Sequence, residues 1–292
     1  MVDAKLVEDL AVDLLRLAAI ELPSDVKGAL EKARGQESSD IAKANLDAIL
    51  ENIRLAESMK RPVCQDTGLI VFFLNVGHDF GSVKGVPEAI AKGTKRATEE
   101  IPLRPNAVHP ITRKNSGDNT GAYVPILNWS YVEGDYLEIT AFPKGGGSEN
   151  MTFFSMVKPG EGIAGIKKFV IDSVISSGGQ PCPPTIIGVG VGGTADLAMK
   201  LAKKCLLRPI GQRHSDPEIA KLEEELLKAI NSTGIGPMGL GGNITSLDVH
   251  VDYAHCHTAS LPVAVNTQCW AARRATARIY KDGSVEILSH RR

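Results

Sequence analysis

Three cysteines in loop-like sequence constrain this chain most, because a metal site shared between them would bring three distant segments together. Cys64, Cys182 and Cys269 lie in RPVCQDTG, GGQPCPPT and NTQCWAARR, which are rich in Gly, Pro and polar residues. Thiolate ligands of an iron–sulfur cluster need such exposed, preorganised turns. We therefore predict that these three cysteines converge on one iron–sulfur cluster.

The number of cysteines indicates what such a cluster would do. Four thiolates saturate a cluster and suit electron transfer, whereas three leave one iron open to oxygen ligands. An open iron acts as a Lewis acid on a hydroxyl or a carboxylate. A zinc site built from two or three cysteines with His255 or His257 is the weaker alternative. Zinc sites usually contain a close ligand pair such as CxxC, and the sequence has none.

The other two cysteines have ordinary explanations. Cys205 lies in the apolar helical pattern MKLAKKCLL and is expected to be a buried, small hydrophobic residue. Cys256 stands between His255 and His257. If this segment is a strand, both histidines point to one face and Cys256 to the other.

Composition excludes several classes of protein. The chain has 292 residues and a net charge of −1, which argues against a nucleic-acid-binding or a polybasic membrane-binding surface. Residues 1–23 carry acids within an apolar stretch, which is typical of an amphipathic helix and not of a signal peptide. Five cysteines without an export signal argue against a disulfide framework. We expect a cytoplasmic enzyme that has neither a membrane nor a nucleic acid as a partner.

Periodicity predicts an α/β (α+β) fold. Apolar residues recur at helical spacing through residues 1–60, which indicates a helical N-terminal part. Through 61–292 helices alternate with short apolar strands, which indicates a mixed β-sheet with flanking helices. Two of the strands, YVPILNW and DYLEITAF, are joined by a short turn and predict a hairpin. We expect residues 1–292 to form a single cluster-binding domain.

A glycine motif offers a competing function. Gly188, Gly190 and Gly193 fit G-x-G-x-x-G between a predicted strand and a predicted helix, as a dinucleotide site requires. The second strand that such a site needs, with an acidic residue at its end, is not evident downstream. The motif alone is therefore a weak indication of nicotinamide binding.

Polar residues follow the first cysteine directly. Gln65 and Asp66 come immediately after Cys64. A carboxylate beside a metal-bound substrate is suited to proton transfer or to orienting a base. The same segment is also compatible with an ordinary turn before the strand that starts near residue 69.

Positive charge gathers in a long polar segment at residues 102–121, which exceeds the length of an ordinary connection. It contains Arg104, His109, Arg113 and Lys114. Arginine matches carboxylates bidentately, although solvated surface is the ordinary explanation for each residue alone.

Two further segments have the composition of a site. The loop KGGGSEN presents bare backbone N–H groups to an anion. Asp248, His250 and Asp252 alternate along a predicted strand, with His255 and His257 beyond them. This polar strand face predicts an active-site wall.

Taken together, RPVCQDTG, KNSGDNTG, PKGGGSEN, QPCPPTIIGVGVGG and VDYAHCHTASLPVAVNTQCWAARR resemble the motifs of the iron–sulfur class I fumarate hydratases and the related L-tartrate dehydratases. The resemblance is to their α-subunit, which is also the N-terminal region of the single-chain forms, and it covers essentially the whole chain. It implies a [4Fe-4S] cluster held by Cys64, Cys182 and Cys269. It implies no ligand role for Cys205 or Cys256.

The resemblance also implies roles for residues around the cluster. Gln65 and Asp66 would line the site, and Arg104 would bind a substrate carboxylate. Gly147 would offer its backbone N–H, and His257 would hydrogen-bond the substrate. Asp66 and His257 are the candidates for catalysis.

In this family the general base, a threonine, belongs to a β part that these residues do not contain. The resemblance therefore implies a separate β-subunit that completes the active site, in an α2β2-type heteromer. The implied reaction is reversible addition of water to the C=C bond of a small dicarboxylate. Fumarate hydratase is favoured, L-tartrate dehydratase is the alternative within the family, and a non-catalytic metal-binding protein or sensor is the alternative from another class.

Overall fold

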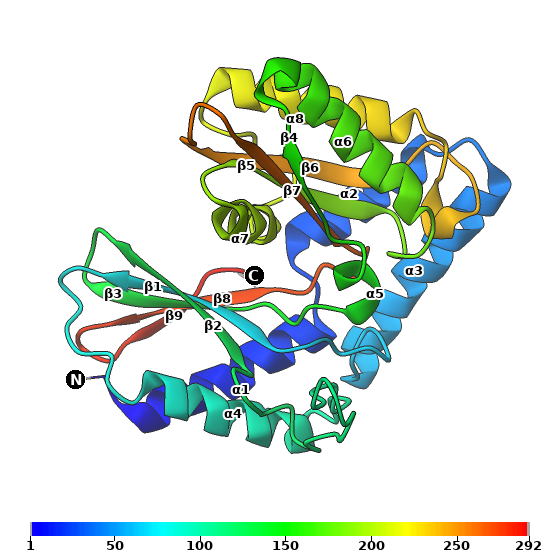
Figure 1. The fold of residues 1–292 in the computed structure, drawn as a ribbon. Coiled ribbons are helices and arrows are strands. Elements are labelled where there is room, and N and C mark those ends of the chain that lie inside the picture. The colour runs from blue at the N-terminus through cyan, green and yellow to red at the C-terminus, as the bar shows by residue number, and fades with distance from the viewer. Residues whose placement is uncertain (1, 291–292) are drawn as a thin grey trace. The chain divides into compact units, whose positions relative to one another are not determined.

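The computed structural model describes residues 2–290, which fold as two compact units, each with its own β-sheet (Figure 1). Unit 1 contains the chain up to Ser24, Asn52–Gly146 and the chain from Arg273 onward, and unit 2 contains Asp25–Glu51 and Gly147–Ala272. Both sheets contain parallel and antiparallel pairs. The predicted α/β fold with mixed sheets is confirmed, and the single domain stays a prediction.

The helical N-terminal part is present as predicted. It consists of α1 (Ala4–Ile20), α2 (Ser24–Gln36) and α3 (Asp40–Met59). Asp3 caps α1, because its carboxylate accepts a hydrogen bond from the N–H of Lys5 at 2.8 Å. Most of the apolar stripe of α1 is buried in the core of unit 1, whereas α2 is largely polar.

Unit 1 is a five-stranded sheet in the order β2-β1-β3-β8-β9. The strands are β1 (Val71–Gly77), β2 (Ile126–Val132), β3 (Tyr136–Ala141), β8 (Ala275–Tyr280) and β9 (Val285–Ile287). Helices α1 and α4 (Val86–Glu100) pack side by side and share one hydrophobic core with β1, β3 and β8 (Figure 1). β1 is buried along nearly its whole length, as its continuous apolar run predicts.

The predicted hairpin is wrong, because β1 lies between β2 and β3 and pairs with both of them. The short connection after β2 crosses the end of β1, where the N–H of Asp79 donates to the carbonyl of Gly134 at 3.0 Å. Gly77 permits this crossing, since a Cβ there would lie 2.3 Å from the same carbonyl oxygen. The most apolar strand has taken the position between β2 and β3, which local turn signals do not reveal.

Unit 2 is a four-stranded sheet in the order β4-β7-β5-β6. Its strands are β4 (Phe153–Val157), β5 (Thr185–Gly192), β6 (Ser246–Ala254) and β7 (Leu261–Gln268). Helices α6 (Gly162–Ser177) and α8 (Pro217–Asn231) share a core with β5, β6 and β7. Ala198 and Ala202 of α7 (Ala195–Cys205) form a separate cluster with Ala264 of β7. The sheet is therefore covered on both faces (Figure 1).

The glycine motif of β5 has a packing explanation. A Cβ on Gly188 would lie 2.0 Å from the carbonyl oxygen of Ala202, and one on Gly190 would lie 2.0 Å from that of Ala198. These two glycines let the backbone of α7 pack directly against β5. Their spacing follows from this contact and requires no dinucleotide.

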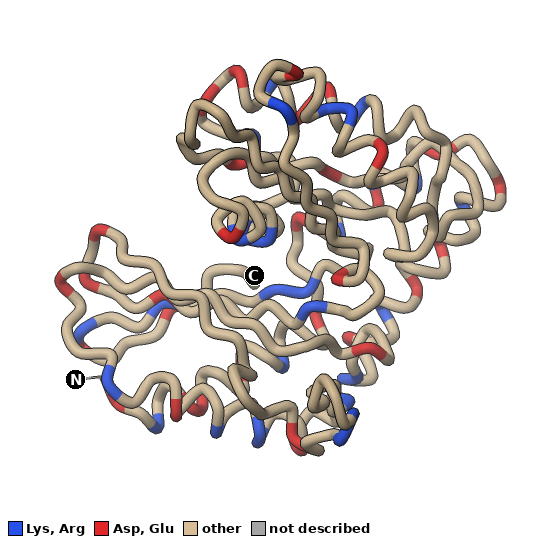
Figure 2. The backbone as a smooth tube through the Cα atoms, in the orientation of Figure 1, with Lys and Arg blue, Asp and Glu red and all other residues tan. Residues whose placement is uncertain are grey.

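Charged residues of both signs are interspersed along the helices of each unit (Figure 2). Within residues 2–290, no helix has the length and apolarity needed to cross a membrane.

Candidate active site

Cys64 lies in an irregular turn between α3 and β1, within unit 1. The residue before it is fixed on both sides. The N–H of Val63 donates to the carbonyl of Ala19 at 2.9 Å, and the carbonyl of Val63 accepts from the side chain of Asn52 at 2.8 Å. The Cys64 thiol is partly exposed and forms no disulfide. The predicted loop environment of this cysteine is confirmed.

Asp66 is the centre of a hydrogen-bond network that ties this turn to three other segments. Its Oδ1 accepts from the N–H of Gly68 at 2.9 Å and from the Asn106 amide at 3.2 Å. Its Oδ2 accepts from the N–H of Gly146 at 2.7 Å. Its backbone carbonyl accepts from Nη1 of Arg273 at 2.5 Å. A carboxylate held by three N–H donors has a fixed orientation, as a group that positions substrate or a base must have.

Arg104 is joined to the same turn through its backbone. The Thr67 hydroxyl accepts from the N–H of Arg104 at 2.9 Å and donates to its carbonyl at 3.2 Å. Asn119 donates to the same carbonyl at 3.1 Å. The side chain of Arg104 is exposed and forms no hydrogen bond or ion pair with the residues the structure describes. Its guanidinium is thus free to bind a carboxylate ligand.

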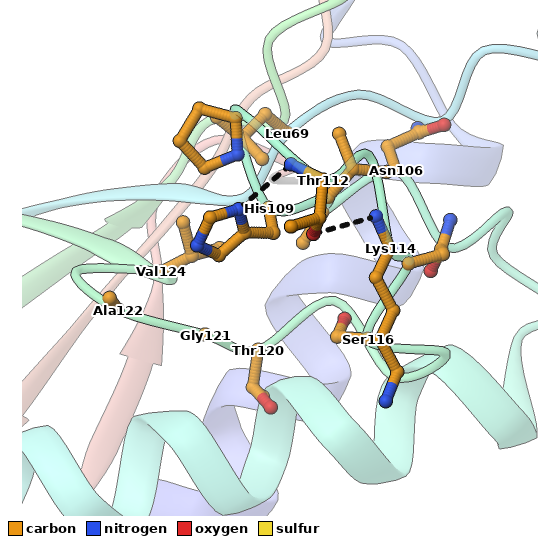
Figure 3. Close-up of a pocket in the computed structure, with 14 residues that line it drawn as sticks. Leu69, Asn106, His109, Thr112, Lys114, Ser116, Thr120, Gly121, Ala122 and Val124 are labelled. Carbon is orange, nitrogen blue, oxygen red and sulfur yellow. Dashed lines mark hydrogen bonds between the residues drawn. The ribbon is translucent and has the colours of Figure 1, made fainter.

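A pocket of about 540 Å³ adjoins the Cys64 turn within unit 1. Its wall is formed by Leu69 and by residues 106–124, the long polar segment (Figure 3). Asn106 belongs to the wall and also donates to Asp66, so it connects the pocket to the turn. The Nδ1 of His109 accepts from the N–H groups of Ile111 and Thr112 at 3.3 and 3.2 Å, which fixes the ring within its own loop.

Of the four basic residues predicted in this segment, only Arg104 is bonded to the turn that carries Cys64. His109, Arg113 and Lys114 are exposed, and Figure 3 shows His109 and Lys114 on the pocket loop itself. Thr67, Asn106 and Asn119, which organise this region, were not predicted. Their role depends on hydrogen bonds between segments that the sequence does not pair.

Cys182 precedes β5 in unit 2 and has a strained backbone, with φ of +56°. Left-handed φ is uncommon for a residue with a side chain and occurs often at functional sites. The conformation is held by the Cys182 N–H, which donates to the carbonyl of Gly179 at 3.1 Å, and by the Cys182 carbonyl, which accepts from the N–H of Trp270 at 3.2 Å. The second bond joins Cys182 to the residue after Cys269. These two segments, predicted to converge, are neighbours in unit 2.

Cys269 follows the end of β7 and is partly exposed. The buried Gln268 donates from its side-chain amide to the Sγ of Cys269 at 3.7 Å and to the carbonyl of Ala271 at 3.1 Å. An amide N–H directed at sulfur stabilises negative charge on it, and such bonds tune iron–sulfur clusters. Gln268 was not predicted as a site residue. Its adjacency to Cys269 in NTQCW was the only available signal.

The strand predicted to carry His255, Cys256 and His257 ends before them. β6 stops at Ala254, where its partner β5 stops at Gly192, so the backbone beyond has no strand to pair with. The predicted alternation of these three side chains is therefore wrong. His257 lies in the loop, and its Nδ1 accepts from the N–H of Ala259 at 3.1 Å. This leaves Nε2 to carry the ring hydrogen and to act as a donor.

Gln65 and Gly147 are both exposed. Gly147 lies in the first turn of the four-residue helix α5 (Gly146–Glu149), where an N–H has no acceptor within the helix. Gln65, Asp66 and Arg104 belong to unit 1, whereas Gly147 and His257 belong to unit 2.

Asp248 and His250 form a buried ion cluster and not the wall of a site. Asp248 accepts from Arg213, from the N–H of Gly211 at 2.6 Å and from Nε2 of His250 at 3.1 Å. The Nδ1 of His250 lies 3.0 Å from the carbonyl of Cys205. The predicted strand alternation is correct, but the active-site interpretation of these two residues is wrong.

Asp248 gives the fold a pH dependence. Burial alone would raise the pKa of Asp248, but the hydrogen bond and charge of His250, the N–H of Gly211 and the Arg213 guanidinium outweigh it and lower the pKa to about 2. A carboxyl group in an unfolded chain has a pKa of about 3.9, so the carboxylate stabilises the fold by about 2–3 kcal/mol above that pH. This stability is lost as the pH falls from about 4 towards 2.

Denaturant unfolding of the wild-type chain and of Asp248→Asn, measured at intervals between pH 5 and pH 3, checks this expectation. The difference in unfolding free energy between the two proteins should shrink as the pH falls. A difference that stays constant over this range would contradict the assignment.

Cys205 is buried, as predicted, and its thiol donates to the carbonyl of Val189 at 3.5 Å. Burial raises the pKa of Cys205 to about 12, so the group stays a neutral thiol and is unsuited to metal binding. Cys256 is exposed, and its thiol donates to the carbonyl of Ser260 at 3.1 Å.

The donor set suits a thiolate-bound cluster. Cys64, Cys182 and Cys269 are partly exposed thiols outside helices and strands, and Cys269 already accepts a hydrogen bond from Gln268. Cys64 belongs to unit 1 and the other two belong to unit 2. Within either unit taken by itself, the described residues contain no group of three or more His, Cys, Asp or Glu side chains that could hold a metal ion.

Comparison with known proteins decides the family. A family model described as fumarate hydratase (Fumerase) matches residues 8–278. The chain belongs to this fumarate hydratase family. The match includes all the cysteines and all the candidate site residues described above.

Three relatives illustrate the similarity within the fumarate hydratase family. The chain is 54% identical over 283 residues to the putative L(+)-tartrate dehydratase subunit alpha of Methanocaldococcus jannaschii, covering 96% of this chain and 99% of that protein. It is 37% identical over 285 residues to the L(+)-tartrate dehydratase subunit alpha of Escherichia coli, covering 97% and 94%. It is 36% identical over 285 residues to the protein of the same name from Shigella boydii, again covering 97% and 94%. The resemblance inferred from the motifs is confirmed over nearly the full chain.

Proposed function

We propose that this chain is the α-subunit of an iron–sulfur hydro-lyase that reversibly adds water to the C=C bond of a small dicarboxylate. The observation that carries the proposal is the Cys64 turn. Asp66 anchors it through hydrogen bonds from Gly68, Asn106, Gly146 and Arg273, and the turn is bonded to the backbone of an exposed arginine. A thiol on an anchored turn, a fixed carboxylate and an unpaired guanidinium are what a site for a metal-bound carboxylate substrate needs.

We expect Cys64, Cys182 and Cys269 to hold a [4Fe-4S] cluster. Support comes from their exposure, from the strained backbone of Cys182 and from the hydrogen bond of Gln268 to Cys269. When bound, the cluster supplies an iron with an open coordination position, which acts as a Lewis acid on a substrate oxygen. The buried thiol of Cys205 supports its exclusion from the ligand set.

Residues of this chain would bind and orient the substrate. Arg104 is available to pair with a carboxylate through its guanidinium, and Gly147 offers its backbone N–H. The Nε2–H of His257 would donate to a substrate oxygen. Gln65 and Asp66 would line the site, and the hydrogen bonds that fix the Asp66 carboxylate would keep it oriented for the substrate.

A separate β-subunit would complete the site and supply the base that removes the C–H proton. The names of the relatives, each a subunit alpha, support a partner chain. We propose an α2β2-type assembly in the cytoplasm.

Fumarate and L-malate are the substrates we favour, in line with the description of the family whose model the chain matches. L-tartrate is the second candidate, because the relatives at 37–54% identity are named for it. Tartrate differs from malate by one additional hydroxyl. A site that hydrogen-bonds this hydroxyl discriminates strongly against a substrate that lacks it.

Anaerobic reconstitution of the chain with the β-subunit encoded in the same genome tests the proposal. The pair should develop the absorbance of an iron–sulfur cluster and dehydrate L-malate to fumarate at a higher kcat/KM than L-tartrate. The α chain alone should turn over neither substrate. A higher kcat/KM with L-tartrate would make L-tartrate the favoured substrate. A complex that contains the cluster but acts on neither substrate would refute the proposed hydro-lyase activity.

A further inference from the structure

A buried arginine that sequence analysis did not single out lies against the Cys64 turn. Arg273 begins the last part of unit 1, shortly after Cys269 in the sequence. Its side chain is 1% exposed, and its Nη1 donates to the backbone carbonyl of Asp66 at 2.5 Å. This bond holds the main chain of the segment that follows Cys64, in addition to the hydrogen bonds of the Asp66 carboxylate. Arg273 therefore fixes the backbone of the turn that contains Cys64, Gln65 and Asp66.

The buried guanidinium of Arg273 lacks a direct ion-pair partner among the described residues. Among the described residues no carboxylate forms an ion pair with it, and its Nε has no hydrogen-bond partner. The nearby Asp66 carboxylate is occupied by the N–H groups of Gly68, Asn106 and Gly146. Burial of a charge is costly unless an opposite charge or hydrogen bonds compensate for it. An anionic group at this turn would supply the missing compensation.

Gly145 makes the close packing around Arg273 feasible. A Cβ on this residue would lie 3.2 Å from Nη2 of Arg273 and 3.3 Å from Oδ2 of Asp66. These distances are shorter than ordinary van der Waals contacts, so a methyl group would displace the guanidinium, the carboxylate or both. The backbone of Gly145 has no positive φ, so an alanine here would act through these two contacts alone and would shift one or both groups by a few tenths of an ångström.

We propose that Arg273 is a positioning residue that clamps the Cys64–Asp66 turn and supplies the buried positive charge facing the anionic cluster and its dicarboxylate substrate. This role rests on the proposed function, because it concerns the same site. A cluster held by three thiolates and a dicarboxylate both bring negative charge. A guanidinium can stabilise them without touching the reacting atoms, as residues behind metal ligands do.

Three variants test the role: Arg273→Met, Arg273→Lys and, as a matched control, Arg278→Met. Arg278 is also in unit 1 but pairs with Glu138 at 2.8 Å, within the sheet. The first readout is hydrogen exchange of the amides of residues 64–69 in the full chain without metal. We expect faster exchange there in Arg273→Met, and unchanged exchange in Arg278→Met.

The second readout is iron retention against a chelator in the reconstituted complex. Arg273→Met should lose iron roughly tenfold faster or more, in line with the effect of other residues behind metal ligands. Arg273→Lys should lose iron more slowly than Arg273→Met but faster than the wild type, because lysine keeps the positive charge but lacks the planar guanidinium. A purely structural role would lower the melting temperature of both Met variants without these local effects.

Wild-type exchange at residues 64–69 and wild-type iron retention in Arg273→Met would overturn the inference. If that variant does not fold, Gly145→Ala replaces it, and both effects are then expected in the same direction but smaller, because the guanidinium is shifted and not removed. Failure of the proposed function is distinguishable, since the wild-type complex would then hold no iron or turn over no substrate. The exchange measurement would still decide whether Arg273 clamps the turn.

Discussion

Cys182→Ser is expected to abolish cluster assembly and to lower kcat of the reconstituted complex by at least roughly 10³-fold. A serine hydroxyl is a poor ligand for iron–sulfur clusters, which select soft thiolates. Serine tolerates the left-handed backbone of this position no worse than cysteine, so the fold should be retained. Iron per chain, the visible spectrum and turnover with the β-subunit measure the effect. Cys64→Ser and Cys269→Ser should behave in the same way.

Cys256→Ser is the matched control for these substitutions. Cys256 is exposed and donates only to the carbonyl of Ser260 in its own loop, a bond that serine can also make. This variant should keep its iron and its activity. Full activity in Cys182→Ser, or loss of iron in Cys256→Ser, would contradict the assignment of the three ligands.

Asp66→Ala should have the second-largest effect, on turnover and on stability together. The substitution leaves the N–H groups of Gly68 and Gly146 and the Asn106 amide without their acceptor. Hydrogen bonds to charged groups contribute about 1.5–3 kcal/mol each, and the exposed ones less, so we expect a loss of about 3 kcal/mol of unfolding free energy. Loss of a positioned proton-handling group lowers kcat by roughly 10²–10⁴-fold.

Asp118→Ala is the control for this substitution. Asp118 belongs to the same unit, and its carboxylate accepts from the N–H and hydroxyl of Thr120 within the polar segment. We expect turnover close to wild type with a smaller loss of stability. Comparable kcat values in Asp66→Ala and Asp118→Ala would show that Asp66 has no role in the active site. Denaturant unfolding and steady-state kinetics of the complex provide the two measurements.

The helices and strands of this chain follow from local pattern, but their pairing does not. The helical N-terminal part lies where its apolar spacing predicts it, and the apolar run before residue 77 forms the buried strand β1. The predicted hairpin between β2 and β3 is wrong because β1 lies between these strands and pairs with both of them. Strand order depends on which strand is most fully buried, and turn residues carry no information about that.

The ligand cysteines could be proposed from the sequence because residue type and loop context are local properties. Arg273 and Asn106 could not, because each acts on Asp66 from a segment far away in the chain. The prediction that the polar strand with Asp248 and His250 forms an active-site wall was wrong for a related reason. Alternating polar residues indicate a common face, but burial beneath Arg213 and Gly211 is set by tertiary packing.

Mössbauer spectroscopy of the complex reconstituted with ⁵⁷Fe tests the central claim most directly, namely that three cysteines hold a cluster with one iron open to substrate. Spectra would be recorded with and without L-malate, and iron would be counted per α chain. We predict about four irons per chain, as [4Fe-4S] assembly requires, and a change at one iron when the substrate is added. A complex that contains zinc without iron, or a spectrum in which no iron changes when L-malate is added, would contradict the account.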